Sequence, residues 1–458
     1  MFRLDFSNPI NVHFMGIGGI SMSGLAEILV DRGFKVSGSD RAPSKITEIL
    51  ESKGITVKYG QVAENITDDI ELLVYTAAIS ADNEELMEAK RRGIECIPRA
   101  DMLGQIMKNY EIPIAISGTH GKTTTTSMIT SVLMQASLDP TVTVGGMLDC
   151  IGGNLRIGQS NIFVTEACEY TNSFLNFFPK ISIILNVEED HMDFFKDIDD
   201  IRNSFRRFAE LLPEDGLLVI SADIDNYEEL CKNVKCKVVT FGNNKSAYYT
   251  ASNVKFNEMG YGSFNVVRNG VEGESIELSV PGDHNITNAL ATLAVADFLN
   301  VEKSGVANGF KAFHGADRRF QYKGETNGIT VIDDYAHHPT EIRATLSAAK
   351  KFGKKINLVF QPHTYTRTKA FFDDFVDVLG MADTIVLAEI YAAREKNTIG
   401  ISSKDIEAAL KNNGKDAHYF ETFEEIEKFI LGNCKSGEML ITMGAGNVDI
   451  IGDNILKK

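Results

Sequence analysis

The chain has 458 residues, of which 43% are hydrophobic, and its formal net charge at pH 7 is −17. This length exceeds one ordinary hydrophobic core, so we expect roughly two to four domains. The acidic balance argues against duplex nucleic acid and an anionic membrane surface as the main partners, because both repel a negatively charged protein. Phosphorylated ligands therefore have to be bound locally, by loops, metal ions and a few cations.

The cysteines and the N-terminus exclude further classes of protein. The six cysteines are scattered, and none belongs to a Cys-x-x-Cys pair, which argues against a zinc knuckle and a disulfide scaffold. The N-terminus lacks a basic-then-apolar leader, and no apolar run approaches the roughly 20 residues of a membrane span. We therefore expect a soluble, cytoplasmic protein with reduced thiols and no membrane or nucleic-acid partner.

The N-terminal part of the chain alternates between strand-like and helix-like segments. Strands are predicted at residues 10–16, 36–39, 72–75 and 94–97, and helices at 21–32, 83–92 and 100–108. This alternation predicts a small parallel sheet covered by helices, a Rossmann-like domain that ends near residue 109.

A glycine-rich loop, Gly16-Ile-Gly18-Gly19-Ile-Ser21, joins the first predicted strand to the first helix. It resembles a dinucleotide fingerprint, although Ser21 takes the third glycine position. We expect a diphosphate to bind at the helix N-terminus. Asp40, which ends the next strand, could accept a hydrogen bond from a ribose hydroxyl. A glycine turn that serves only strand–helix packing remains the alternative.

The strongest motif is Gly118-Thr119-His120-Gly121-Lys122-Thr123-Thr124, which lies between an apolar strand at 113–116 and a helix at 123–135. Strand, glycine turn, lysine, threonine and helix form the arrangement that binds a nucleotide triphosphate. Lys122 is expected to reach the outer phosphates, and the Thr123 hydroxyl to ligate Mg²⁺. The common spacing has a glycine where this chain has Ile116, so the loop is contracted. A plain helix start capped by Thr123 is the alternative.

The central part continues with a mixed pattern. Further strands are predicted at 161–165, 181–186, 217–221 and 237–241, with a helix at 201–212 among them. Residues 247–280 alternate between apolar and polar side chains, which indicates antiparallel strands. A helix from about 284 to 298 begins with His284, Asn285 and Asn288, which either bind a purine edge or cap the helix.

Two polar residues close strands beside the phosphate loop. Glu166 ends one predicted strand, and an acid at a neighbouring strand end can reach the Mg²⁺ held by such a loop. His191 follows another strand and is a candidate for a second Mg²⁺ or for phosphoryl oxygens, although Mg²⁺ prefers oxygen ligands. Asp190 and His191 forming a simple turn is the alternative.

The last part reads as a doubly wound α/β unit. Strands are predicted at 330–332, 357–360, 384–388 and 439–442, and helices at 340–350, 368–379, 403–411 and 423–431. Polar loops follow these strands, where ligands of such sheets bind. Arg367 offers a fork that matches a carboxylate, and a helix N-terminus is a poor place for an unpaired cation, so we expect an anionic ligand there.

Together these motifs resemble one family, the Mur ligases. The matching segments span the chain in family order: Gly16 to Gly24, Gly118 to Thr124, Glu166 to Tyr170, Asn186 to Asp193, His284 to Asn288, Arg318 to Gln321, Asp333 to Glu341, Gln361 to Arg367 and Gly444 to Asn447. The Asp-Asp-Tyr-Ala-His-His-Pro-Thr-Glu run and the histidine of the phosphate loop resemble the branch that adds alanine.

The resemblance implies three domains: UDP-sugar binding at 1–109, ATP binding at 110–322 and amino-acid binding at 323–458. It implies that the lactyl carboxylate of UDP-N-acetylmuramate attacks the ATP γ-phosphate, and that the amine of L-alanine then displaces phosphate from the acyl phosphate. The expected cofactors are ATP, as a substrate, and Mg²⁺. The expected partners are these small molecules, and the expected assembly is a monomer or homodimer.

The resemblance also implies roles for individual residues. Lys122, Glu166, His191, His337 and Arg367 are the catalytic candidates. ATP is expected at Gly118, Thr119, His120, Gly121, Lys122, Thr123, Thr124, Asn288, Arg319 and Asp334. The UDP-sugar is expected at Gly16, Gly18, Gly19, Ser21, Asp40 and Arg99, the amino acid at Tyr335, His337, His363 and Arg367, and the metal at Thr123, Glu166 and His191.

Two departures and three alternatives accompany this assignment. Arg206 lies near the place where several Mur ligases carry a carbamylated lysine, so we predict no carbamate. Cys168 stands where many relatives carry aspartate, and we assign it no role. The alternatives are another ligase of the superfamily, such as a muropeptide-recycling or folate-polyglutamylating enzyme, a nicotinamide dehydrogenase and a non-catalytic nucleotide switch.

Overall fold

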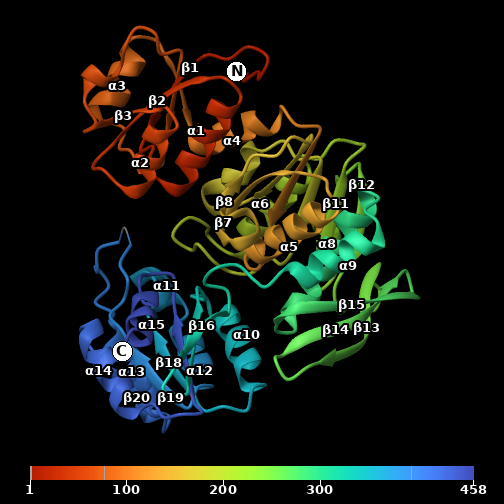
Figure 1. Ribbon diagram of the computed structural model, residues 1–458, viewed down its shortest axis with the longest axis vertical. Helices are drawn as coiled ribbons and strands as arrows, with labels where there is room; N and C mark the ends of the chain where they lie inside the picture. The colour runs from red at the N-terminus through yellow and green to blue at the C-terminus, as the bar shows by residue number, and fades with distance from the viewer. Residues whose placement is uncertain (1–2, 77, 394) are drawn as a thin grey trace.

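The computed structural model describes residues 3–76, 78–393 and 395–458. The chain folds into three α/β units, each built around its own sheet of 5, 10 or 6 strands. Figure 1 shows the N-terminal unit at one end of the long axis, the C-terminal unit at the other and the central unit between them. No helix in the described ranges combines the length and apolarity that a bilayer crossing requires.

The N-terminal unit has a parallel sheet in the order β3-β2-β1-β4-β5. Its strands are β1 (Asn11–Met15), β2 (Lys35–Asp40), β3 (Thr56–Tyr59), β4 (Leu72–Tyr75) and β5 (Glu95–Pro98), and its helices are α1 (Ile20–Asp31), α2 (Lys45–Ser52), α3 (Glu84–Arg91) and α4 (Arg99–Met107). The order reverses at β1, so the loop between β1 and α1 opens at the crevice where such sheets bind ligands.

The central unit has a sheet in the order β15-β14-β13-β12-β11-β10-β6-β9-β7-β8. Its strands are β6 (Ile112–Ser117), β7 (Thr141–Leu148), β8 (Gly153–Arg156), β9 (Ile162–Glu166), β10 (Ile181–Ile184), β11 (Leu217–Ser221), β12 (Lys237–Phe241), β13 (Tyr249–Phe256), β14 (Tyr261–Arg268) and β15 (Val271–Pro281). Its helices are α5 (Lys122–Gln135), α6 (Ile198–Ala209), α7 (Tyr227–Cys231), α8 (His284–Phe298) and α9 (Lys303–Ala312). Parallel pairing of β6 with both β9 and β10 brings the ends of three strands to one edge.

The C-terminal unit has a sheet in the order β16-β17-β21-β18-β19-β20. Its strands are β16 (Gln321–Thr326), β17 (Ile329–Asp334), β18 (Ile356–Phe360), β19 (Thr384–Leu387), β20 (Ala417–Tyr419) and β21 (Met439–Met443). Its helices are α10 (Pro339–Lys350), α11 (Tyr365–Ala370), α12 (Phe372–Leu379), α13 (Ser403–Asn412), α14 (Phe423–Asn433) and α15 (Asp449–Leu456). Only β16 runs antiparallel to its neighbour.

The cores follow the sequence pattern that predicted them. The central strands of all three sheets are buried along almost their whole length, as expected where helices cover both faces. In β18, for example, all five residues are buried. The three-unit α/β arrangement, with an antiparallel portion formed by β13, β14 and β15, agrees with the predicted fold class.

One predicted helix is wrong and several short strands were missed. The segment 368–379 is not one helix, because the backbone leaves helical geometry at Phe371, where φ is −108° and ψ is 27°, and separates α11 from α12. Arg367 therefore lies inside α11 rather than before a helix. The hairpin of β7 and β8 was missed because its glycines interrupt the alternation.

Candidate active site

The phosphate loop lies between β6 and α5, and glycine is required at two of its positions. Gly118 has φ of +139° and Gly121 has φ of +84°, in the left-handed region that side chains disfavour. A Cβ on Gly118 would lie 2.9 Å from Leu185 Cβ, and one on Gly121 would lie 3.1 Å from Asn288 Oδ1. The loop is therefore packed against the next strand and against α8.

Lys122 begins α5 and turns back over the loop. Its Nζ atom donates hydrogen bonds to the carbonyls of Gly118 and Thr119 and lies 3.0 Å from Glu169 Oε2. Burial alone would lower the pKa of Lys122, but the Glu169 carboxylate outweighs burial and raises it to about 12. The charged ammonium is therefore fixed where an anionic phosphate group would meet it. Glu169 was part of a recognised motif but had been given no role.

Thr123 and Glu166 provide the oxygen atoms that a divalent metal would need. The carboxylate of Glu166 accepts a hydrogen bond of 2.6 Å from Gly145 N, and a Cβ on the next residue, Gly146, would lie 3.3 Å from Thr123 Cγ2. Register pairs Glu166 with Ile116 at the end of β6. A hydroxyl and a carboxylate at one sheet edge fit Mg²⁺, which prefers oxygen ligands.

His191 lies near this edge of the sheet, where it contacts other side chains of the site. Its ring stacks on Tyr170 at a centroid distance of 4.5 Å, and its Nε2 atom lies 3.8 Å from both Glu169 Oε1 and Asp190 Oδ2. Glu169 therefore stands between Lys122 and His191. As a nitrogen donor, His191 fits Mg²⁺ less well than Thr123 and Glu166 do.

A cavity lies between the phosphate loop and the C-terminal unit, and we call it the inter-unit cavity. The central unit contributes His120, Gly121, Thr124, Asn186, Glu188, Val280, Pro281, His284, Asn285 and Asn288 to its lining. The linker, the segment that connects the central unit to the C-terminal unit, contributes Gly315, Ala316, Arg319 and Phe320. The C-terminal unit contributes Asp334, Thr340, Glu341, Ala344 and Thr345. Six of the ten residues predicted to bind ATP thus line one space: His120, Gly121, Thr124, Asn288, Arg319 and Asp334.

The polar walls of the inter-unit cavity are fixed by internal hydrogen bonds. Asn288 donates to Asn285 Oδ1 at 3.1 Å, and Asn285 donates to the Pro281 carbonyl at 2.7 Å. Asp334 accepts hydrogen bonds from Phe320 N at 2.9 Å and Ala336 N at 2.7 Å. Burial raises the pKa of Asp334 to about 6. Asp334 therefore braces the linker as well as lining the cavity.

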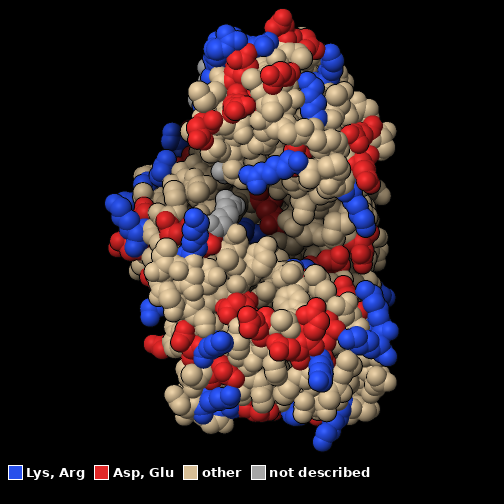
Figure 2. Space-filling view, turned by 90° about the vertical axis from the view of Figure 1, so that its left-hand side faces the viewer, with Lys and Arg blue, Asp and Glu red and all other residues tan. Residues whose placement is uncertain are grey.

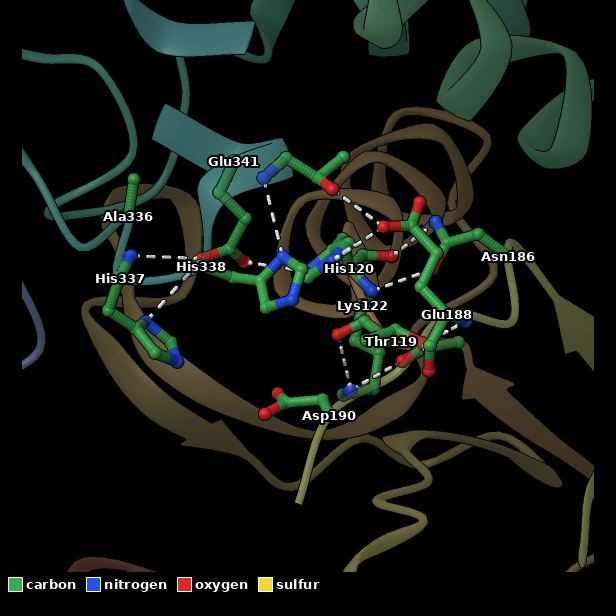
Figure 3. A network of polar contacts seen from close by, with 12 residues as sticks. Thr119, His120, Lys122, Asn186, Glu188, Asp190, Ala336, His337, His338 and Glu341 are labelled. Carbon is green, nitrogen blue, oxygen red and sulfur yellow. Dashed lines mark hydrogen bonds and ion pairs between the residues drawn. The ribbon is translucent and has the colours of Figure 1, made fainter. Parts of the chain in front are cut away.

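His120 occupies the wall between the units. Its backbone is held by Asn186, which accepts from His120 N at 2.8 Å and donates to His120 O at 3.1 Å. Its ring faces Glu188 Oε2 at 3.4 Å and Glu341 Oε1 at 3.2 Å. Figure 3 shows these side chains converging on His120 from the loop after β10 and the start of α10.

The four predicted amino-acid-binding residues lie close together on the C-terminal unit. Arg367 donates to His363 Nδ1 at 3.0 Å, His363 lies 5.7 Å from His337 between ring centroids, and His337 lies 5.5 Å from Tyr335. Burial lowers the pKa values of His337 and His363 to about 4. Both imidazoles are therefore neutral near pH 7.

Arg367 also crosses to the central unit. Its Nη2 atom lies 2.9 Å from Asp190 Oδ1, and both side chains are nearly buried. Burial alone would raise the pKa of Asp190, but Arg367 holds it well below the ordinary range. Asp190, which the sequence indicates only as a possible turn residue, is therefore a charged partner within the site.

A second cavity lies between the N-terminal and central units. Its lining residues include Ser21, Arg99, Glu166 and Cys168, so two of the predicted UDP-sugar ligands meet the predicted metal ligand. Among the described residues Arg99 has no carboxylate partner, and burial lowers its pKa. Figure 2 shows a hollow in the surface between the upper and lower parts of the molecule.

The glycine loop of the N-terminal unit differs in one respect from expectation. Gly16 has φ of +77° and Gly18 N donates to Asp40 Oδ2 at 2.8 Å. Asp40 therefore holds the loop through Gly18 and is not free to serve a ribose alone. Gly19 caps α1 without a side chain, which leaves the helix N-terminus open beside Ser21.

Several acidic residues of the site were not predicted from the sequence, although they lie near residues that were. Glu169, Glu188 and Asp190 follow β9 and β10, and Glu341 lies in the first turn of α10. Their position at strand ends was the available signal. Arg206 forms an ion pair with Glu210 at the C-terminal end of α6.

Comparison with known families gives three matches in chain order. The model described as Mur ligase family, catalytic domain, matches residues 11–111. The Mur ligase middle domain matches residues 116–296, and the Mur ligase, glutamate ligase domain, matches residues 318–446.

Individual relatives match over the full length. The UDP-N-acetylmuramate–L-alanine ligases of Agathobacter rectalis and Lachnospira eligens are 56% and 54% identical to this chain, with 100% of each chain covered. The crystal structure of UDP-N-acetylmuramate–alanine ligase from Thermotoga maritima is similar with a TM-score of 0.81 at 31% identity, covering 98% of both chains. A murein peptide ligase from Psychrobacter arcticus shares the fold, with a TM-score of 0.69 at 24% identity and 98% coverage of both chains.

Proposed function

The chain belongs to the Mur ligase family, and from that premise we propose that it joins L-alanine to the lactyl carboxylate of UDP-N-acetylmuramate in a reaction driven by ATP. Its full-length relatives at 49–56% identity carry this activity in their names. The product is a precursor of peptidoglycan. The muropeptide-recycling alternative is not favoured, because full-length relatives at 52–56% identity are named as alanine-adding ligases.

One observation carries the assignment of the site: a series of polar contacts joins the phosphate loop to the amino-acid candidates. Lys122 contacts Glu169 at 3.0 Å, Glu169 lies 3.8 Å from His191, and His191 lies 3.8 Å from Asp190. Asp190 in turn contacts Arg367 at 2.9 Å. The central lysine and the C-terminal arginine therefore face one reaction space rather than opposite surfaces.

The proposed reaction has two steps. The lactyl carboxylate attacks the γ-phosphorus of ATP, which forms an acyl phosphate and releases ADP. The amine of L-alanine then attacks the acyl carbon, phosphate leaves, the amide forms and the nitrogen loses a proton. An anion attacks another anion in the first step, so positive charge around the phosphates is the main requirement.

We assign this charge to the phosphate loop. Lys122 and the loop N–H groups bind the β- and γ-phosphates, and Thr123 and Glu166 hold Mg²⁺, with His191 as a further candidate ligand. Bound Mg²⁺ would neutralise charge on the phosphate oxygens. The ring of His191, fixed by Tyr170, lies close enough to Glu169 to orient it.

We assign the amine substrate to the C-terminal unit. Arg367 offers a fork for the alanine carboxylate. His337 donates from Nδ1 to the carbonyl of Tyr335 at 2.9 Å, so its Nε2 atom is left as an acceptor for a substrate N–H. His363, which accepts from Arg367, keeps the fork in place.

We assign the sugar nucleotide to the N-terminal unit and the second cavity. The domain limits that we propose are 1–109, 110–322 and 323–458. Arg99, which has no carboxylate partner among the described residues, supplies a cation for an anionic group of the UDP-sugar, next to the open N-terminus of α1. A cytoplasmic location fits substrates such as ATP and a UDP-sugar, and a monomer or homodimer remains our expectation.

The decisive test is phosphate release by the purified protein with ATP, Mg²⁺, UDP-N-acetylmuramate and a panel of amino acids. We expect release only when the sugar nucleotide and L-alanine are both present. Release that depends on a tripeptide instead of L-alanine would support the recycling activity and contradict this proposal.

A further inference from the structure

His120 is an imidazole held between carboxylates that come from two different units. Glu188 belongs to the loop after β10 of the central unit, and Glu341 lies in the first turn of α10 in the C-terminal unit. The ring reaches Glu341 through Nδ1 at 3.2 Å and Glu188 through Nε2 at 3.4 Å. The Nε2 atom is buried and makes no hydrogen bond within the described residues, so the ion pair with Glu188 is its compensation.

Other contacts join the same two segments. Thr340 donates from its hydroxyl to Glu188 Oε2 at 2.6 Å, and His338 Nε2 donates to the carbonyl of Glu189 at 3.1 Å. The rings of His120 and His338 lie 4.6 Å apart. The start of α10 is therefore fastened to the loop after β10, with His120 at the centre of the contact (Figure 3).

The chemistry of the cluster suits a proton better than a metal ion. His120, Glu188 and His338 have ligand atoms within 4.8 Å of one another. Both nitrogens of His338 are already used, however, because Nδ1 accepts from Thr340 N at 3.3 Å while Nε2 donates to Glu189. Without a lone pair from His338, only His120 and Glu188 remain, too few for a closed site.

The charged ring of His120 lies between two carboxylates and reduces the repulsion between them. The Glu341 side chain is 13% exposed and that of Glu188 is 37% exposed, so Glu341 is the carboxylate that most needs a positive partner. Burial alone would lower the pKa of His120, but these two carboxylates raise it to about 9. The other charged neighbour is Arg319, which lies 3.8 Å from Glu341 on the linker side.

The contact sets the position of the amino-acid candidates. His337 directly precedes the segment that His120 holds, and its Nδ1 atom lies 3.4 Å from Glu341 Oε2. Asp190, the partner of Arg367, follows Glu188 by two residues. A shift of α10 relative to the phosphate loop would therefore move His337 and Arg367 relative to the nucleotide.

We propose that His120 is a positioning residue that docks the C-terminal unit onto the phosphate loop by bridging Glu188 and Glu341, and thereby aligns the amine substrate with the acyl phosphate. The inference rests on the proposed function, since it concerns the ligation step. It differs from the expectation that His120 binds ATP directly, because its ring atoms are engaged by the protein's own carboxylates.

The test is a double-mutant cycle of His120→Gln and Glu341→Gln, measured as kcat/KM for L-alanine in the phosphate-release assay. We expect His120→Gln to lower kcat/KM by at least about tenfold in the wild type but by less than about threefold in the Glu341→Gln background. KM for UDP-N-acetylmuramate should stay the same, and circular dichroism at the assay temperature should show that the variants remain folded.

Two outcomes would overturn the proposal. One is independent effects that multiply in the double variant, and the other is a rise in KM for ATP alone, as a direct phosphate ligand would give. Arg343→Gln is the matched control, because Arg343 lies on the same helix and pairs with Asp377 inside the C-terminal unit; it should leave the kinetics unchanged. A wild-type protein without alanine-dependent phosphate release would instead reject the proposed function.

Discussion

Arg367 and Asp190 form an ion pair between the C-terminal and central units, with Nε at 3.2 Å and Nη2 at 2.9 Å from the same oxygen, Oδ1. Their side chains are 9% and 8% exposed. The arginine fork is thus occupied by a carboxylate of the protein. The carboxylate of an amino acid is the chemically matched group to share or replace it.

Arg367→Ala should raise KM for L-alanine by roughly 10- to 100-fold, because a charge-assisted hydrogen-bonded contact is lost. KM for ATP should change much less. Arg367→Lys is the informative comparison, since lysine keeps the charge but not the fork and should recover only part of the loss. Steady-state kinetics with each substrate varied in turn gives both constants; equal rises in both would argue against a carboxylate contact.

Lys122→Ala should abolish ATP turnover while leaving the UDP-sugar site intact. The ammonium is fixed over the loop by Glu169, whereas the second cavity is lined by other residues, among them Ser21 and Arg99. Calorimetric titration with UDP-N-acetylmuramate, run beside the phosphate-release assay, separates the two. Loss of sugar binding along with turnover would mean that the two sites are not separate.

His120 should make the stability of the protein depend on pH. Its folded pKa of about 9 lies above the ordinary histidine value of about 6.5. The charged ring therefore stabilises the fold fully below pH 6.5, and this contribution disappears as pH rises to about 9, with an upper limit on the order of 3 kcal/mol. Melting temperatures of the wild type and His120→Gln should differ most at pH 6 and converge above pH 9. A difference that stays constant with pH would contradict the charged state.

Glu85 should be essential for the N-terminal unit. It is fully buried and contacts His13 Nε2 at 2.7 Å and the Ser39 hydroxyl at 2.8 Å. The Ser39 carbonyl in turn accepts from Gly16 N and Ile17 N, so this network supports the glycine loop. Glu85→Ala should destabilise the protein by about 3–5 kcal/mol, since a buried pair is broken.

Thermal unfolding and UDP-N-acetylmuramate titration check this prediction together, and we expect both the melting temperature and the affinity to fall. Asp69→Ala is the control, because Asp69 pairs with Lys35 on the surface and its loss should leave the melting temperature nearly unchanged. A Glu85 variant as stable as this control would show that the buried network is dispensable.

Much of the fold could be predicted from the local sequence. The strand, glycine loop and helix around Lys122 were predicted within about two residues, because the apolar run, the two glycines and the helical spacing all lie in one segment. The alternation of strands and helices in the C-terminal unit was equally readable. The three-unit α/β fold that followed from these patterns is confirmed by the family matches.

The rest depended on contacts between distant segments. The break at Phe371 was hidden because the residues on both sides have helical spacing. The short strands β3, β8 and β20 have three or four residues each, too few to show a period. The pairing of His120 with Glu341 joins residues 221 positions apart, and only the docking of two units reveals it. The grouping of predicted ATP-binding residues in one cavity agrees with expectation, but their individual roles stay predictions.

The inter-unit cavity has one wall on the central unit and another on the C-terminal unit. A molecule that fills it contacts His120 and Asn288 on one side and Asp334 and Thr345 on the other. By thermodynamic linkage, every contact that stabilises the close approach of the two units also strengthens the binding of that molecule. Contacts from both units would then slow the release of ADP, so bond making need not set the pace of the cycle.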